Sequence, residues 1–317
     1  MSTAVPAEAT PRLGRFRRSP DSVGAGRLGR SRRFVLLGAA FAFVLVAWEA
    51  VKWLGGVPWR FPNALGLGVD VFHDPPFRWP FASDLNLPHW WEILGALAAP
   101  VQRNQEASLA EFLFGAALYT WREAGIGFVV GALLGLTLAT VFVHSGLLER
   151  AFVPYVVASQ TIPILALAPM IVLAFGQSVI SVVIIATYLT FFPVTIAMIR
   201  GLRSPDPRAL ELMRSYAASR WAVYRKVRLP ASIPYLFTAL KIAATASIVG
   251  AIIGEGPGGI PNGLGIAIIN FNTQYITAPE KLWAAILASA LLGIAFFALV
   301  RVAELVALRG RPAATEG

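Results

Sequence analysis

The sequence contains no cysteine, and this absence excludes disulfides, thiolate metal sites and thiol catalysis. Histidine is almost as scarce, because only His73, His89 and His144 occur, and their spacing does not match that of metal ligands. No lysine follows a glycine, as a phosphate-binding P-loop requires. We therefore expect no metal site, and we expect that this chain does not hydrolyse ATP through a P-loop.

Charge is also in short supply. Only 14% of the residues are charged, whereas soluble domains carry about 25%. Hydrophobic residues make up 56% of the chain, and the mean hydropathy is +0.65. A soluble fold could not cover so much apolar surface with so few charges, so the composition predicts an all-α polytopic membrane protein.

Six apolar runs approach the length of about 20 residues that crosses a bilayer as a helix. They cover Phe34–Leu54, Gly125–Val143, Phe152–Phe175, Val179–Ile199, Leu236–Gly254 and Leu282–Val300. Arginines gather before the first run, after the fourth and after the sixth, so the positive-inside rule predicts that both termini are cytoplasmic. This loop pattern accounts for the net charge of +10, and we expect no nucleic-acid partner.

The first run has a second interpretation. Ser31–Phe34 followed by apolar residues and Ala40–Ala42 is similar to a twin-arginine export signal with a cleavage site. The apolar stretch continues to Trp48, which favours a retained first helix. The connection after it is rich in aromatic residues, and either a position in the lipid headgroup layer or a plain insertion loop explains it. A helical pattern begins at Leu109 and leads into the second run.

Small residues recur at every fourth position in the second and fifth runs, which lets helix backbones approach closely. These residues are Gly127, Gly131, Gly135, Ala239, Ala243, Ser247 and Ala251. Prolines interrupt the third and fourth runs, because each removes a backbone donor and bends the helix. They are Pro163, Pro169 and Pro193. The polar residues Ser159, Gln160 and Thr161 precede the first of them, and they either line a path for a polar solute or join neighbouring helices.

The segment between the fourth and fifth runs predicts two short helices outside the bilayer. Asp206 can cap a helix that begins at Pro207, and Ser219 can cap a second helix that Pro230 ends. Apolar residues form a stripe on each helix, and the two helices join near Ala217. Such amphipathic helices bind either lipid headgroups or the groove of a partner.

The spacing in this segment resembles the EAA loop of ABC importer permeases, in which Glu-Ala-Ala precedes a Gly and then an aliphatic residue before Leu-Pro. Glu211 matches the Glu, Val227 the aliphatic residue and Leu229–Pro230 the ending. Leu212–Met213 replace the Ala pair, and Ala217 replaces the Gly. Since alanine resists a positive φ, we expect the turn to use ordinary dihedrals or to fall at a neighbouring residue.

The resemblance covers roughly residues 116–300. Ala158–Pro163 with Ala168–Pro169 and Phe175–Gly176 resemble the third span of nitrate, sulfonate and taurine permeases. Ser215–Trp221 and Leu229–Ser232 are most similar to the branch associated with thiamine pyrimidine precursors and riboflavin.

The resemblance implies a permease subunit of an ATP-driven importer in the cytoplasmic (inner) membrane, with no enzymatic activity and no cofactor of its own. The solute would be a pyrimidine or thiamine precursor, riboflavin, or a sulfonate- or nitrate-type anion. The partners would be a separate ATPase, an outer substrate-binding protein and a second copy of the permease. The residues that it assigns to ATPase docking and coupling are Glu211, Ala217, Arg220, Trp221, Val227, Leu229 and Pro230.

With this family in view, the chain divides into five parts. A disordered basic cytoplasmic tail covers 1–33, the first transmembrane helix 34–54 and the aromatic-rich outer connection 55–118. The permease core covers 119–304 with the coupling loop at 200–234, and a cytoplasmic tail covers 305–317.

Gly254–Gly259 satisfies G-x-G-x-x-G, but it follows an apolar run rather than a strand, so we expect an outer turn. Glu255 in this turn either lines the pathway or pairs with Lys281.

Two other functions are compatible with a membrane bundle. An ion-gradient-driven secondary transporter needs acids near the bilayer middle, and the runs contain only Glu49, close to an end. A membrane enzyme needs paired carboxylates, a histidine cluster or a nucleophile with its base, and no run contains such a set. The importer permease is therefore the favoured hypothesis.

Overall fold

A computed structural model of the chain describes residues 25–61, 71–102, 106–258, 260 and 262–309. Contacts between residues divide it into two compact units, 1–83 and 84–317. Among the described residues, five helices are long and apolar enough to cross a bilayer, and a bent helix pair makes a sixth when it is counted as one span. The prediction of an all-α polytopic membrane protein is confirmed.

The first unit consists of one long helix and a short return of the chain. Helix α1 covers Ala25–Gly55, so the chain is already helical before the predicted start at Phe34, and the rest of the predicted tail lies outside the described residues. Two strands that the sequence did not indicate, β1 (Trp59–Phe61) and β2 (Val71–His73), form an antiparallel pair. The 3-10 helix η3 (Pro80–Ala82) follows.

The return segment closes the end of α1. Phe77 N–H donates to Leu54 O at 3.0 Å, and Trp79 N–H donates to Gly55 O at 2.7 Å. These bonds satisfy carbonyls that a helix C-terminus leaves without partners. The aromatic connection is therefore attached to the last turn of α1.

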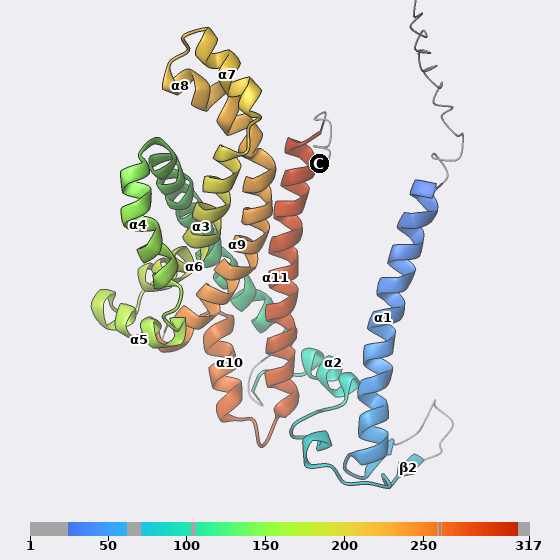
Figure 1. Cartoon of the computed structure of the whole chain (residues 1–317). Coiled ribbons are helices and arrows are strands. Elements are labelled where there is room, and N and C mark those ends of the chain that lie inside the picture. The colour runs from blue at the N-terminus through green and yellow to red at the C-terminus, as the bar shows by residue number, and fades with distance from the viewer. Residues whose placement is uncertain (1–24, 62–70, 103–105, 259, 261, 310–317) are drawn as a thin grey trace, which may run out of the picture. The chain divides into compact units, whose positions relative to one another are not determined.

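The second unit is a helical bundle (Figure 1). Its long helices are α3 (Leu109–His144), α6 (Val179–Arg203), α9 (Leu229–Gly258) and α11 (Pro279–Ala307). Shorter helices are α2 (Trp90–Ala98), α4 (Gly146–Ser159), α5 (Ile164–Phe175), α7 (Pro207–Ser215), α8 (Arg220–Val223), the π-helical turn η4 (Tyr224–Arg228) and α10 (Leu264–Thr273). Helix α3 begins at the predicted Leu109.

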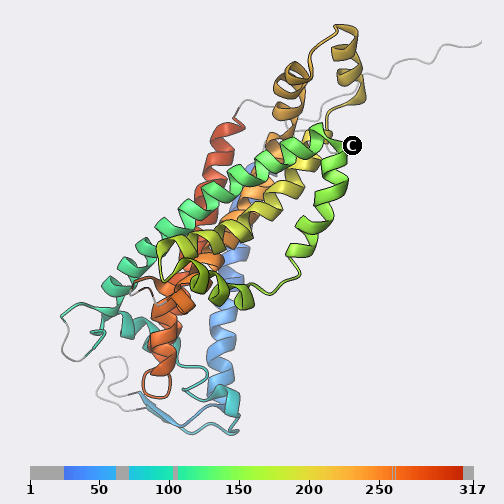
Figure 2. The ribbon, with the colours of Figure 1, turned by 90° about the vertical axis from the view of Figure 1, so that its left-hand side faces the viewer.

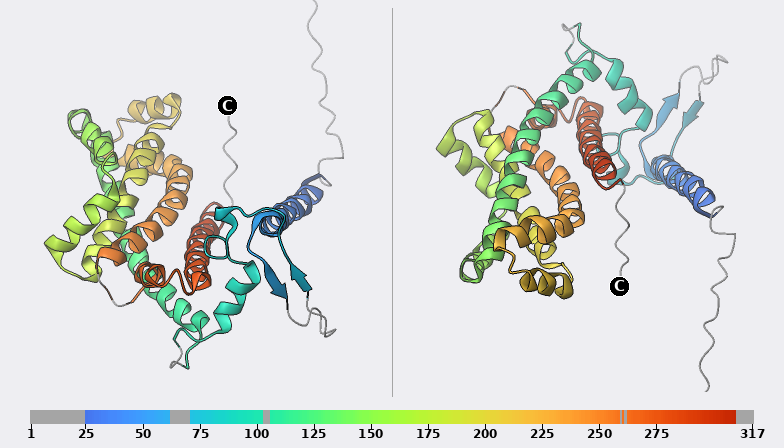
Figure 3. Two further views of the ribbon diagram at one scale, coloured as in Figure 1. Left: turned by 90° about the horizontal axis from the view of Figure 1, so that it is seen from below. Right: turned by 90° about the horizontal axis from the view of Figure 1, so that it is seen from above.

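Helix α6 packs between α3 and α9, and α11 packs against α3 and α9 (Figure 2). Seen along the bundle, α4 and α5 lie on the side of this layer away from α11 (Figure 3).

The predicted strips of small residues form the contacts between these helices. A Cβ added to Gly131 would lie 2.6 Å from the Thr190 Cβ on α6, and one added to Gly127 would lie 2.4 Å from the Ala186 Cβ. Neither distance is possible for a real side chain, so only glycine permits this approach of α3 to α6. The strip on α9 from Ala239 to Ala251 is likewise buried. The packing prediction is confirmed.

The third predicted span is not one straight helix. Helices α4 and α5 meet at an angle of 99°. Pro163 is the cap of α5, so the break falls where the backbone donor is missing. Pro169 and Pro193 remain inside α5 and α6, and the prediction that they interrupt these helices is wrong. Packing of α6 on both sides outweighs a single lost hydrogen bond.

Candidate functional site

The segment between α6 and α9 forms the two predicted short helices outside the long bundle. The Asp206 carboxylate accepts a hydrogen bond from Arg208 N–H at 2.8 Å, which caps α7. Ser219 Oγ accepts from Ala222 N–H at 3.2 Å, which caps α8. Both capping predictions are confirmed, so side chains placed locally in the sequence set where each helix begins.

The turn between these helices falls on Ala217, and its backbone is left-handed. Its φ is +50°, the sole positive φ of a non-glycine residue within the described ranges. Ala217 N–H donates to Arg214 O at 2.8 Å, and Ala218 N–H donates to Met213 O at 3.0 Å, which is the Schellman pattern of a helix end. The expectation of ordinary dihedrals is therefore wrong. Two hydrogen bonds and the capped second helix hold alanine where glycine fits without strain.

The sequence pattern predicted that the second short helix ends at Pro230, and this prediction is wrong. The helix continues from Arg220 through η4 into α9, which ends at Gly258. Within the π-helical turn, Leu229 N–H donates to Tyr224 O. This wider turn changes the spacing of the backbone hydrogen bonds directly before Pro230, which has no N–H to donate. The helix can therefore continue through Pro230. The exposed segment is thus joined to a spanning helix without a break.

Segment 207–230 exposes large apolar and aromatic side chains. The exposed fractions are 56% for Leu212, 76% for Tyr216 and 59% for Trp221. The Arg225 guanidinium lies 5.8 Å from the centre of the Trp221 ring. Aromatic and arginine side chains of this kind dominate the binding energy of protein interfaces.

Most of the predicted docking residues lie on this exposed surface. The exposed ones are Glu211, Ala217, Arg220, Trp221 and Pro230. Val227 and Leu229 are half-buried, and Leu229 packs against the apolar cluster that joins α3, α6 and α9.

The inner side of the segment is anchored by Tyr224. Tyr224 is 6% exposed and belongs to the same apolar cluster. Its hydroxyl lies 2.9 Å from the Thr140 Oγ on α3, and its ring packs on the edge of the His144 ring. Thr140 and His144 were missed because no local pattern relates positions 140 and 224.

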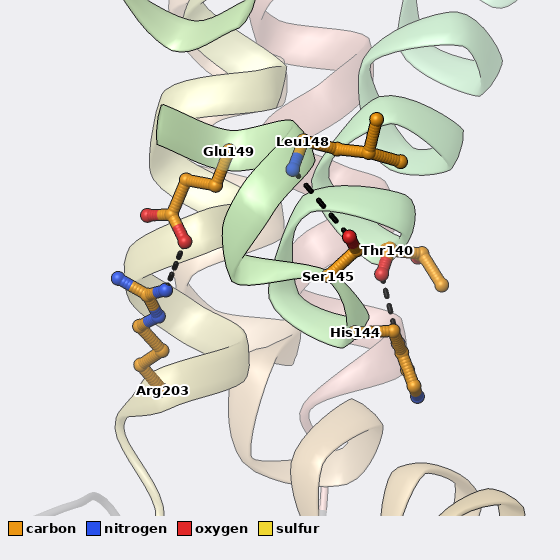
Figure 4. A network of polar contacts seen from close by, with 6 residues as sticks. All are labelled: Thr140, His144, Ser145, Leu148, Glu149 and Arg203. Carbon is orange, nitrogen blue, oxygen red and sulfur yellow. Dashed lines mark hydrogen bonds and ion pairs between the residues drawn. The ribbon is translucent and has the colours of Figure 1, made fainter. Parts of the chain in front are cut away.

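Polar contacts also hold the neighbouring helix ends at this side of the bundle (Figure 4). Glu149 on α4 forms an ion pair with Arg203 at the end of α6. Ser145 Oγ accepts a hydrogen bond from Leu148 N–H at 3.4 Å and so caps α4. His144 Nδ1 bonds to Thr140 O at 2.8 Å. These contacts fix the ends of α3, α4 and α6 beside the exposed segment.

The three polar pathway candidates lie at the break between α4 and α5. Ser159 Oγ donates to Val156 O at 2.8 Å, and Thr161 Oγ donates to Ala158 O at 2.7 Å. Gln160 is half-buried beside them. Their hydroxyls satisfy the carbonyls at the end of α4, so the break leaves polar groups at an otherwise apolar position.

Glu255, the fourth candidate, is enclosed. It accepts from Thr120 Oγ at 2.6 Å and from Gly265 N–H at 2.6 Å, and it is 0% exposed. Glu255 does not form the alternative ion pair with Lys281, whose ammonium instead donates to Val101 O.

Glu255 also lies on a helix rather than in a turn, since α9 continues to Gly258, and the prediction of an outer turn is wrong. Its carboxylate instead fixes the start of α10, whose cap Gly263 has no side chain.

A second buried acid lies beside it. The Glu123 carboxyl is 1% exposed, and neither of its oxygens has a hydrogen-bond partner among the described residues. The prediction that Glu49 is the only acid within a span is therefore wrong, because Glu123 and Glu255 lie inside α3 and α9. Both fell just outside the apolar runs by which the spans were delimited.

Comparisons with known proteins agree with the arrangement of these elements. Residues 127–305 match the family model described as binding-protein-dependent transport system inner membrane component. The formylaminopyrimidine transport permease ThiX of Halalkalibacterium halodurans is 35% identical over 217 residues, which cover 68% of this chain and 86% of that protein. The chain belongs to this permease family. It is therefore a multi-pass transport subunit of the inner membrane, and the family's importers work with an ATPase and a substrate-binding protein.

Other similar proteins support the same assignment. The riboflavin permease RibX of Chloroflexus aurantiacus is 32% identical over 52% of this permease and 61% of its own length. The nitrate import permease NrtB of Leptolyngbya laminosa is 26% identical over 90% and 92% of the two chains. A solved structure of an amino acid ABC transporter with histidines covers 62% of this permease and 94% of that chain, with a TM-score of 0.51 and 17% identity, and shows the same fold.

Proposed function

We propose that residues 207–230, called the docking segment from here on, bind the ATPase and convert its nucleotide cycle into movement of the bundle. The single observation that carries the proposal is the exposure of Leu212, Tyr216 and Trp221 on helices joined without a break to α9. A rigid connection passes a displacement of the surface directly to a spanning helix. Glu211, Arg220 and Pro230 share this surface and complete the proposed contact.

The test uses two substitutions that leave the fold of the segment intact. Glu211→Ala removes an exposed charge from a helix, and Ala217→Asp adds a charge at a left-handed position that aspartate tolerates. We expect both variants to insert into the membrane and to lose ATPase co-purification and uptake. Uptake by membranes that contain no ATPase would contradict the proposal and favour an ion-gradient-driven transporter.

We further propose that the solute is a small nitrogen heteroaromatic compound. This rests on identity, because the relatives named for formylaminopyrimidine and riboflavin are 35% and 32% identical, whereas the nitrate permease is 26% identical. Mass spectrometry of the ligand retained by the co-expressed outer binding protein tests it. A sulfonate or an inorganic anion as that ligand would contradict the proposal.

We propose in addition that two copies of the permease form the pathway, with the break between α4 and α5 facing it. Helix α5 exposes Leu165, Met170 and Leu173 by 65% or more, and the polar group at Ser159–Thr161 lies beside it. Since Glu255 is enclosed, it lines a pathway only after α10 moves. Crosslinking of a Leu173→Cys variant, in a chain without cysteine, is expected to yield a covalent dimer. Exclusively monomeric product would contradict this arrangement.

A further inference from the structure

Tyr224 contacts the exposed docking surface on one side and a different spanning helix on the other. Its ring stacks on Trp221, with centroids 5.3 Å apart and planes 17° from parallel. On the inner side its hydroxyl lies 2.9 Å from Thr140 Oγ, and its ring meets that of His144 edge-on at 5.3 Å. Tyr224 thus lies between the surface proposed to bind the ATPase and helix α3.

The direction of the inner hydrogen bond follows from the partners of Thr140. Thr140 Oγ donates its one proton to Leu136 O at 2.8 Å, so the Tyr224 hydroxyl is the donor to Thr140. His144 Nδ1 bonds to the Thr140 carbonyl at 2.8 Å, which fixes the imidazole against the tyrosine ring. The tyrosine is held at both its hydroxyl and its ring face, in a site that is 6% exposed.

The backbone at this position is also irregular. Tyr224 begins the π-helical turn, and its carbonyl accepts from Leu229 N–H. A π turn inside an α-helix widens the helix and changes the direction of the side chains, and such turns are frequent at functional sites. The turn accompanies the inward position of Tyr224, while Trp221 one helical turn earlier remains 59% exposed.

We propose that Tyr224 is the positioning residue through which displacement of the docking segment reaches α3. The proposal rests on the proposed function, because it assumes that the ATPase binds this segment. Helix α9 follows the segment through the continuous backbone, whereas α3 belongs to a separate part of the chain. The hydrogen bond to Thr140 and the contact with His144 couple α3 to that movement. Nucleotide-driven movement of α3 then depends on the Tyr224 hydroxyl, although ATPase binding does not.

The experiment measures movement of the far end of α3 in the complete permease–ATPase complex. The chain has no cysteine, so Gly115→Cys introduces a unique thiol at an exposed position where an added Cβ meets nothing within 4 Å. Gly115 lies 25 residues before Thr140 on α3, about 37 Å along the helix. The rate of labelling by a membrane-impermeant maleimide is compared with and without ATP and vanadate.

In the Gly115→Cys variant we expect nucleotide to change the labelling rate. The ratio of the labelling rates with and without nucleotide is expected to fall about fivefold in Tyr224→Phe, because one hydrogen bond changes an equilibrium by about that factor. Thr140→Val removes the same bond from α3 and is expected to have the same effect. The double variant should be no worse than either single one, because the bond is lost once. Tyr216→Phe is the control, since this residue of the same segment is 76% exposed.

The outcomes are distinguishable. An unchanged ratio in Tyr224→Phe, with the ATPase still bound, overturns the positioning role and leaves the docking proposal intact. An equal loss in Tyr216→Phe also overturns it, because the effect would then not belong to the inner hydrogen bond. Failure of the unsubstituted permease to retain the ATPase overturns both proposals. Loss of the ratio in Tyr224→Phe and Thr140→Val with normal ATPase binding and unchanged thermal stability supports the assignment.

Discussion

The left-handed turn at Ala217 predicts that a single methyl group weakens the docking segment. A non-glycine residue in this conformation costs about 1–2 kcal/mol, and glycine avoids that cost. Glycine also loses about 0.5–1 kcal/mol through its greater freedom in the unfolded chain. Ala217→Gly is therefore expected to stabilise the turn by about 0.5–1 kcal/mol. The substitution also restores the residue that the EAA loop has at this position.

The neighbouring Ala218 provides a matched control, because its φ is not positive. Ala218→Gly carries the entropic cost without relief of strain and should destabilise by about 0.5–1 kcal/mol. The two substitutions add the same flexibility to the unfolded chain at adjacent positions. Changes in stability of opposite sign would therefore show that the backbone conformation at Ala217 is the cause.

Hydrogen exchange is the direct assay, since the N–H groups of both alanines donate to the end of α7. A gain of about 1 kcal/mol slows exchange through local opening about fivefold. Slower exchange in residues 212–222 for Ala217→Gly and faster exchange for Ala218→Gly are expected. Faster exchange in both variants would refute the assignment of strain to Ala217.

Two further predictions concern the packing of the bundle and its buried acids. Gly131→Ala should lower stability by about 1–3 kcal/mol, because the added Cβ would lie 2.6 Å from Thr190. Gly125→Ala is the control and should be neutral or stabilising, because an added Cβ there meets nothing within 4 Å. Thermal unfolding in detergent measures both. Glu255→Ala leaves Gly265 N–H without its acceptor and should cost about 1–3 kcal/mol. Glu123→Gln breaks no hydrogen bond among the described residues and replaces a buried carboxyl by a neutral amide, so its melting temperature should equal or exceed that of the unsubstituted protein. Equal melting temperatures within either pair would contradict the corresponding contact.

Much of the fold is encoded in local patterns. The apolar runs define the spanning helices, and Asp206 and Ser219 mark the starts of α7 and α8 because a capping side chain acts within three residues. The strip from Gly127 to Gly135 predicted a close helix contact, although the sequence did not show that α6 is the partner.

The failures share a different physical origin. The helix through Pro230 and the left-handed Ala217 depend on hydrogen bonds and packing that outweigh a local preference. Glu123 was passed over and Glu255 was assigned to an outer turn because both lie at the edges of apolar runs, where a sequence does not distinguish a solvated acid from an enclosed one. The link between Tyr224 and Thr140 spans 84 residues, and no periodicity reveals it.

The affinity of the ATPase for vesicles that contain the permease tests the central claim most directly. Trp221 is an exposed aromatic residue of the docking segment, and truncation of such an interface residue costs about 2 kcal/mol or more, about 30-fold in affinity. Ile276 is 83% exposed and lies in the connection between α10 and α11, outside the docking segment. The account predicts that Trp221→Ala weakens ATPase binding about 30-fold or more and that Ile276→Ala leaves it unchanged. Equal affinity of the Trp221→Ala variant and the unsubstituted permease would contradict it.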